Sequence, residues 1–207
     1  LNEYGIADQS YALSLRSAEL AREVANDFSA RSFPRFVSGA VGPTTKLPTL
    51  GHISFDAMYQ SYLPNMRGLL DGGVDLIHIE TCQDILQIKC AVVAAHDAMR
   101  QAGRSVPVAV TVTLEMTGTM LVGSEIGAAL TVLQSLPVDI VGLNCATGPD
   151  LMQENVRFLG TTSTRPLCIY PNAGLPRNVN GKAVYDLPPE TLADYHEIFV
   201  KDYGVAI

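Results

Sequence analysis

The sequence lacks the features that mark several large classes of protein. Charged residues make up only 17% of the 207, the net charge is −7, and no stripe of lysine and arginine suits nucleic acid. No apolar run reaches the roughly 18 residues that a membrane-spanning helix needs. Residues 1–30 show helical spacing with carboxylates inside it, unlike a signal peptide. We therefore expect a cytoplasmic protein that binds neither nucleic acid nor membrane.

Two cofactor and scaffold motifs are also missing. None of the four cysteines forms a Cys-x-x-Cys pair, and in an apolar α/β chain of this length they are typical of reduced thiols rather than of a disulfide framework. No Gly-x-Gly-x-x-Gly follows a strand, which argues against a dinucleotide-binding fold. The apolar share of 47% indicates a globular domain with a sizeable core.

Segments with helical spacing alternate with short apolar runs. The runs at 35–40, 74–80, 106–114, 138–144 and 167–171 predict strands, and helices are predicted at 7–28, 55–70, 84–101, 124–136, 150–159 and 190–203. This alternation predicts a parallel sheet with crossover helices. Pro64 is expected to kink or break the second helix. No linker divides the chain, so residues 1–207 are expected to form a single domain.

The ends of the chain suggest that it is part of something longer. It opens without methionine, at the start of a helical pattern, and residues 205–207 begin a further strand. Five strands and the start of a sixth fall short of the eight that close a (β/α)8 barrel. We therefore expect a piece of a longer polypeptide.

Polar or flexible residues stand where the predicted strands end. They are Ser38 and Gly39, Glu80, Asn144 and Cys145, and Asn172. In a parallel barrel such strand ends meet at one rim, where active sites are built. Each of these side chains also has a structural interpretation.

Cys145 is either a metal ligand or nucleophile, or a small buried hydrophobe. Glu80 either caps a helix or pairs with a lysine, or else accepts a substrate ammonium or acts as a base. Asn144 and Asn172 hold either a loop or an amino-acid substrate. Zinc usually takes three or four nitrogen or sulfur ligands, and nothing else in the sequence obviously completes such a set around Cys145.

Four stretches, in order and spread over nearly the whole chain, resemble motifs of the homocysteine S-methyltransferase family. They are Phe-Val-Ser-Gly-Ala-Val-Gly-Pro-Thr at 36–44, Ile-Glu-Thr at 79–81, Gly-Leu-Asn-Cys at 142–145 and Pro-Asn-Ala-Gly-Leu-Pro at 171–176. Each alone is a weak signal, but together they are specific. The last stretch, with Tyr185 and Asp186 beyond it, is most similar to the cobalamin-dependent members. The members that use betaine or S-methylmethionine resemble it less.

The resemblance implies a (β/α)8 barrel of the TIM type, incomplete here because the first two strands and the end of the last are missing. It implies zinc held by three cysteines, of which Cys145 is one and the other two would follow Ile207. The isolated piece is therefore expected to be inactive.

The implied reaction is methyl transfer from methylcobalamin to homocysteine, giving methionine. Other modules of the same polypeptide would carry the cobalamin and recharge it from 5-methyltetrahydrofolate. Zinc turns a thiol into a thiolate, so the substrate sulfur is the nucleophile and Cys145 is a ligand. Glu80 and Asn144 would hold the amino-acid end of homocysteine, with Ser38, Gly39 and Asn172 as further rim candidates. The alternatives are a standalone enzyme that uses betaine or S-methylmethionine, and a barrel that binds a small molecule without catalysis.

Overall fold

The computed structural model describes residues 1–207, apart from the side chain of Asn2. Five strands form one sheet in chain order: β1 (Ser38–Val41), β2 (Leu76–Cys82), β3 (Val108–Val112), β4 (Ile140–Asn144) and β5 (Leu167–Tyr170). The β1–β2 and β4–β5 pairs are parallel. The α/β class and the parallel sheet are confirmed, whereas the eight-stranded barrel stays a prediction.

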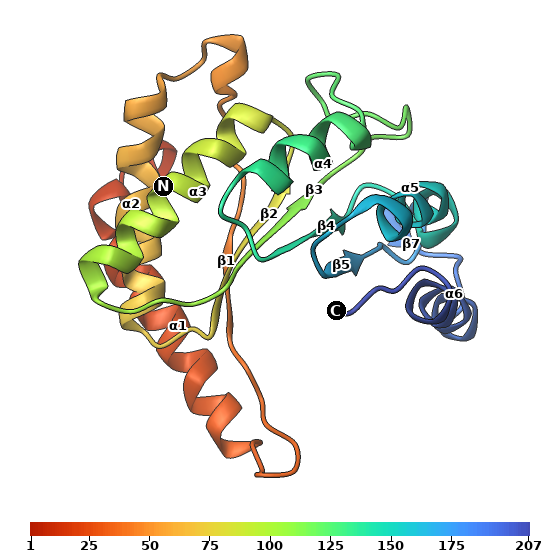
Figure 1. Ribbon diagram of the computed structural model, residues 1–207, viewed down its shortest axis with the longest axis horizontal. Coiled ribbons are helices and arrows are strands. Elements are labelled where there is room, and N and C mark those ends of the chain that lie inside the picture. The colour runs from red at the N-terminus through yellow and green to blue at the C-terminus, as the bar shows by residue number, and fades with distance from the viewer. The chain divides into compact units, whose positions relative to one another are not determined.

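The described residues also form six α-helices (Figure 1). They are α1 (Ser10–Asp27), α2 (Phe55–Asp71), α3 (Ile85–Ala102), α4 (Ile126–Ser135), α5 (Pro149–Thr162) and α6 (Pro189–Lys201). Short 3₁₀ helices lie at Asn2–Tyr4, Ala7–Gln9 and Pro48–Leu50. Every predicted helix is present within a few residues, and α2 runs through Pro64 without a break. None of the helices described has the length and apolarity to cross a bilayer.

The chain divides into two compact units. The first comprises residues 1–79 and 86–109, and the second comprises residues 80–85 and 110–207. In the first unit, α1 lies along α2 (Figure 1). This approach depends on Gly68, where a Cβ atom would come 2.4 Å from the carbonyl oxygen of Tyr11. The side chains of Met58, Met66 and Ile77 are fully buried in the core of this unit.

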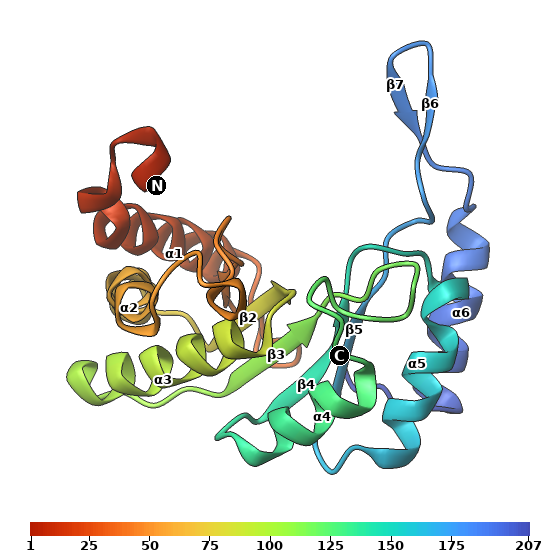
Figure 2. The same ribbon diagram turned by 90° about the horizontal axis from the view of Figure 1, so that it is seen from above.

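In the second unit, β4 and β5 pair beneath α5 and α6, which lie side by side (Figure 2). Gly160 permits the contact between the two helices, because a Cβ atom there would lie 2.4 Å from the carbonyl oxygen of Tyr203. Val205 forms a parallel bridge with Leu167, and the amide of Ile169 donates to the carbonyl oxygen of Ile207. The prediction that a further strand begins at 205–207 is thus confirmed as a short parallel pairing.

The antiparallel hairpin of β6 (Arg177–Val179) and β7 (Lys182–Val184) was not predicted. Its turn is Asn180-Gly181, with φ values of 53° and 80°. Asn-Gly is favoured where both central residues of a hairpin turn need positive φ. Figure 2 shows the hairpin projecting from the rest of its unit. All its strand residues are exposed, so no burial pattern marked them in the sequence.

Several predicted boundaries differ from the observed ones by two or three residues, and two of these differences have a clear cause. The first strand is Ser38–Val41 rather than residues 35–40, because the amide of Val37 donates to the carboxylate of Asp75 instead of entering the sheet. Ser38 and Gly39 therefore begin the strand instead of ending it. Helix α4 begins at Ile126 rather than at residue 124. The carbonyl oxygen of Ser124 instead accepts a hydrogen bond from the amide of Met120 in the preceding loop.

Candidate functional site

The ends of β2, β4 and β5 are tied together within the second unit. The amide of Thr81 donates to Oδ1 of Asn144 at 2.9 Å. The amide of Cys145 donates to the carbonyl oxygen of Tyr170 at 3.0 Å. The amide of Asn172 donates to the carbonyl oxygen of Thr147 at 3.1 Å. The structure thus brings the strand ends that carry Glu80, Asn144, Cys145 and Asn172 into one cluster.

Ser38 and Gly39 belong to the first unit, where they begin β1. In register they are level with Leu76 and Ile77, four and three residues before Glu80 on β2. Gly39 is buried against Val74 and Leu69, where a Cβ atom would meet Val74 Cγ1 at 3.0 Å. Ser38 is exposed on the opposite face of the strand. Their predicted place at the carboxyl end of the strand is therefore corrected, because the strand starts later than its sequence pattern suggested.

Asn144 is the centre of the cluster. Its side chain is buried, with 2% of the residue exposed. Its Nδ2 donates to Oγ1 of Thr81 at 2.7 Å and to Sγ of Cys145 at 3.2 Å, while its Oδ1 accepts from the Thr81 amide. Both amide hydrogens of the side chain are thus used inside the protein, which leaves only a lone pair on Oδ1 for another partner.

The backbone around Asn144 adopts a conformation that residues other than glycine rarely take. Thr81, Cys145 and Ala146 have φ values of 58°, 59° and 59°. For a β-branched residue such as Thr81 this is a clear outlier. Such strain persists only where surrounding bonds fix it, and it gathers at functional sites. Here the bonds of Asn144 and a contact from the Thr147 amide to the Cys145 carbonyl oxygen at 2.7 Å hold it.

Cys145 is half-buried, and the other three cysteines are buried. Burial raises the pKa of the Cys82 thiol to about 12 and that of Cys90 to about 11, and it also raises the pKa of Cys168. Cys82, which follows the rim in sequence, is therefore a core residue. Among the four described cysteines, Cys145 alone is not buried.

Glu80 is half-buried and lies near β5. Partial burial, a hydrogen bond with the Cys168 thiol and the charges of Cys168 and Glu80 raise the pKa of the Tyr170 phenol. Glu80 also contributes to the raised pKa of Cys168, after the larger effect of burial. The carboxylate and the phenol thus lie close enough to interact. A negative charge in this position suits a substrate ammonium group.

The sequence interpretation missed two site residues besides Tyr170. Thr81 supplies an amide and a hydroxyl to Asn144, and Thr113, just after β3, donates its hydroxyl to the Asn144 carbonyl oxygen at 2.9 Å. The Thr113 amide also donates to the carbonyl oxygen of Cys82 at 3.1 Å. The sequence signals were the place of each residue at a strand end and, for Thr81, its position in the Ile-Glu-Thr motif at 79–81.

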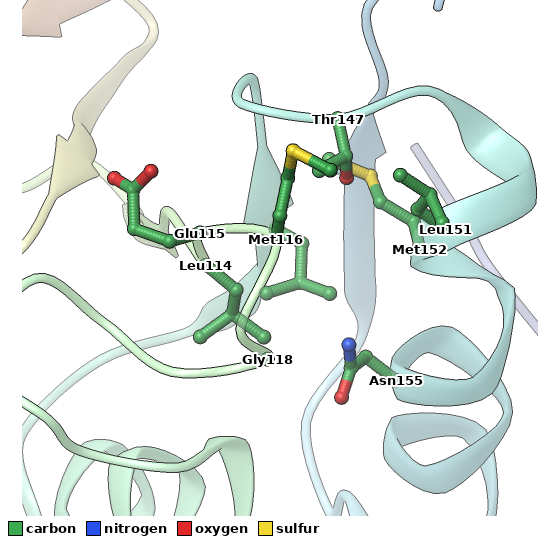
Figure 3. A pocket seen from close by; sticks show the side chains of 9 residues that line it. Leu114, Glu115, Met116, Gly118, Thr147, Leu151, Met152 and Asn155 are labelled. Atoms are coloured by element: carbon green, nitrogen blue, oxygen red, sulfur yellow. The ribbon is translucent and has the colours of Figure 1, made fainter.

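A small cavity of about 60 Å³ opens beside the cluster (Figure 3). Leu114, Met116, Leu143 and Met152 form the apolar part of its walls. Asn155 lines it from α5 (Figure 3). Thr147, two residues after Cys145, lines it as well. Sites for small-molecule ligands are typically about 300–1,000 Å³. The cavity is therefore too small to hold an amino acid on its own.

The described residues do not make a complete metal site. Among them, no three His, Cys, Asp or Glu side chains gather closely enough to hold a metal ion. A thiolate is a ligand that zinc favours. A zinc site needs four protein ligands, or three protein ligands and a water or substrate molecule. Cys145 thus fits one position of a zinc site, and the rest of the set is not supplied by these residues.

The fold and the site define an α/β protein with a parallel sheet and a thiol, a carboxylate and amides at its strand ends. The family model described as "Homocysteine S-methyltransferase" matches residues 1–207. The chain therefore belongs to the homocysteine S-methyltransferase family, as the four motifs predicted.

Two curated relatives are methionine synthases. The chain is 47% identical to that of Mycobacterium leprae (strain TN) and 46% identical to that of Mycobacterium tuberculosis (strain ATCC 25618 / H37Rv), over all 207 residues. It spans only 17% of the length of each. Among solved structures, the metallated form of the homocysteine methyltransferase MmuM from Escherichia coli matches with a TM-score of 0.68 and 25% identity. That match covers 81% of this chain and 60% of the other.

Proposed function

We propose that this chain is the homocysteine-binding module of a cobalamin-dependent methionine synthase. In this account it forms part of a (β/α)8 barrel within a longer cytoplasmic polypeptide. Other modules of that polypeptide carry methylcobalamin and 5-methyltetrahydrofolate. The identity to two methionine synthases, each about six times longer than this chain, supports the proposal.

The observation that carries the proposal is the half-buried thiol of Cys145, held at a turn that directly follows β4. Cys145 would supply one ligand to zinc, with the remaining cysteines contributed from outside these residues. Zinc, when bound, lowers the pKa of a coordinated thiol so that homocysteine binds as a thiolate. The likeness to the metallated MmuM structure supports a metal in this family's barrel.

The residues of the chain itself would orient the substrate. The Glu80 carboxylate, whose charge helps to raise the pKa of the Tyr170 phenol, would receive the ammonium group of homocysteine. The substrate sulfur would then lie toward Cys145 and accept the methyl group. Asn172, just beyond β5, remains a proposed rim residue.

A second candidate is a homocysteine methyltransferase that takes its methyl group from betaine or S-methylmethionine, favoured by the likeness to MmuM. A third is a barrel that binds a small molecule without catalysis. The intact protein, incubated with homocysteine and each methyl donor in turn, distinguishes the three by the methionine formed. The proposal expects methionine with methylcobalamin. Turnover only with betaine or S-methylmethionine favours the second candidate, and binding of homocysteine without any turnover favours the third.

The role of Glu80 is tested in the same assay. Glu80→Gln removes the charge but keeps the shape, so the KM for homocysteine should rise about tenfold or more, the effect of losing a charge-assisted hydrogen bond. Glu154→Gln is the matched control, because Glu154 is exposed on α5 and pairs with Arg157. An unchanged KM in Glu80→Gln would show that Glu80 does not bind the substrate.

A further inference from the structure

In the cluster at the strand ends, the side chain of Asn144 forms its hydrogen bonds with Thr81 and with the Cys145 thiol. Asn144 is nearly fully buried, and both hydrogens of its Nδ2 are used, one on Thr81 Oγ1 and one on Cys145 Sγ. Its Oδ1 accepts from the backbone of Thr81. A residue that holds a substrate needs free donors or acceptors facing the cleft, and Asn144 has few.

The same bonds join the three positions with positive φ. Asn144 contacts Thr81 at two atoms, and its own backbone leads directly into Cys145 and Ala146. Thr113 holds the Asn144 carbonyl oxygen from the neighbouring strand end. The bonds to Thr81 and Thr113 join different strand ends, so the turn at Cys145 is fixed from β2 and β3 as well as from β4.

We propose that Asn144 and Thr81 form a positioning pair that fixes the direction of the Cys145 thiol, in place of the substrate contact first expected for Asn144. The N–H···S bond restrains the sulfur, and the two bonds to Thr81 fix the amide that donates it. This inference deepens the proposed function and rests on it for the kinetic test alone. Residues that orient metal ligands or reactive groups commonly change affinity or activity by about 10–100-fold when removed.

Three variants of the intact protein test the pair. Asn144→Ala removes all three bonds. Thr81→Val removes only the hydroxyl and keeps the shape of the side chain and the backbone donor. Thr81→Ser is the matched control, because it keeps both the hydroxyl and the amide.

The kinetic readout is the split between kcat and KM for homocysteine. A positioning role predicts that Asn144→Ala lowers kcat about 10–100-fold and changes KM little. Thr81→Val should lower kcat about fivefold, the factor that corresponds to the loss of one hydrogen bond. Thr81→Ser should have a kcat close to that of the unaltered protein. A raised KM with unchanged kcat in Asn144→Ala would overturn the proposal, because Asn144 would then hold the substrate.

The second readout needs neither metal nor turnover. Alkylation of the metal-free protein by iodoacetamide is followed at each cysteine peptide by mass spectrometry, at pH values where the rate at Cys145 no longer rises. Loss of the restraining donor should speed the labelling of Cys145 about fivefold in Asn144→Ala and leave it within about twofold in Thr81→Ser. The buried Cys82, Cys90 and Cys168 report whether a variant has loosened the whole fold. Unchanged labelling of Cys145 in both Asn144→Ala and Thr81→Val would refute the positioning pair.

The two readouts also separate this inference from the proposed function. If the unaltered protein makes no methionine from homocysteine, the proposed function fails, and the labelling of Cys145 alone decides the inference. If Asn144→Ala exposes all four thiols, the Thr81→Val and Thr81→Ser pair decides it.

Discussion

The tight surroundings of Gly142 predict a large effect of one added methyl group. Gly142 on β4 lies level with Cys168 on β5. A Cβ atom at Gly142 would come 1.7 Å from the carbonyl oxygen of Cys168 and 2.7 Å from its carbonyl carbon. The obstacle is main chain and not a flexible side-chain end, so Gly142→Ala must push β4 and β5 apart.

The expected cost is large for so small a change. Extra methyl groups in packed cores usually destabilise by about 1–3 kcal/mol. Since no side chain can turn away from the clash, we expect a value at the upper end, about 3 kcal/mol. That is a substantial part of the roughly 5–15 kcal/mol that stabilises an ordinary domain. The displacement would also reach Asn144 and Cys145, two and three residues further along the strand.

The assay is urea unfolding followed by circular dichroism, with Gly127→Ala as the control. A Cβ atom at Gly127 in α4 would meet only Phe158 Cζ, at an ordinary 3.6 Å. Replacing a helical glycine with alanine should stabilise by about 0.5–1 kcal/mol. The reasoning is refuted if Gly142→Ala unfolds at the same urea concentration as the unaltered protein.

Two further predictions concern the first unit. Gly68→Ala would place a Cβ atom 2.4 Å from the Tyr11 carbonyl oxygen, so α1 and α2 should separate and the free energy of unfolding should fall by about 1–3 kcal/mol. An unchanged thermal midpoint would contradict this. Burial alone would raise the pKa of Asp75, but the Val37 amide and the Arg22 guanidinium outweigh it and hold the pKa below the ordinary 3.8. A carboxyl with a lowered folded-state pKa adds stability that is present above its unfolded pKa and lost as the pH falls through the folded one. The urea concentration at the midpoint of unfolding should therefore fall as the pH is lowered below about 4. This fall should be smaller in Asp75→Asn. Equal pH dependence in the two proteins would show that Asp75 contributes nothing.

The order of helices and strands was predictable because burial leaves a periodic record in the sequence. Runs such as 138–144 are apolar since they are covered on both faces, and α2 shows its buried stripe despite Pro64. The hairpin at 177–184 leaves no such record, because its strands are short and exposed. The start of β1 depends on the bond between Val37 and Asp75, residues 38 apart, which no local pattern reports.

The site was predictable in its location but not in its internal bonding. The predicted strand end places Asn144 and Cys145 at the end of β4, where the structure has them, whereas β2 continues past Glu80 to Cys82. The roles of Thr81 and Asn144 depend on a contact across 63 residues and on positive φ at residues other than glycine. A glycine in a sequence indicates where such a backbone conformation can occur, but a threonine or a cysteine does not.

The most direct test of the account compares Cys145→Ala with Cys90→Ala in the intact protein. Zinc content and methionine formation from homocysteine are measured together, with circular dichroism as the check on folding. Because Cys145 lies at the half-exposed strand end, its replacement should abolish most of the zinc binding and the methyl transfer while the fold stays intact. Cys90→Ala should keep both, because Cys90 is a buried core thiol. Full zinc content and full activity in Cys145→Ala would contradict the central claim that this thiol is the metal ligand of a homocysteine-binding site.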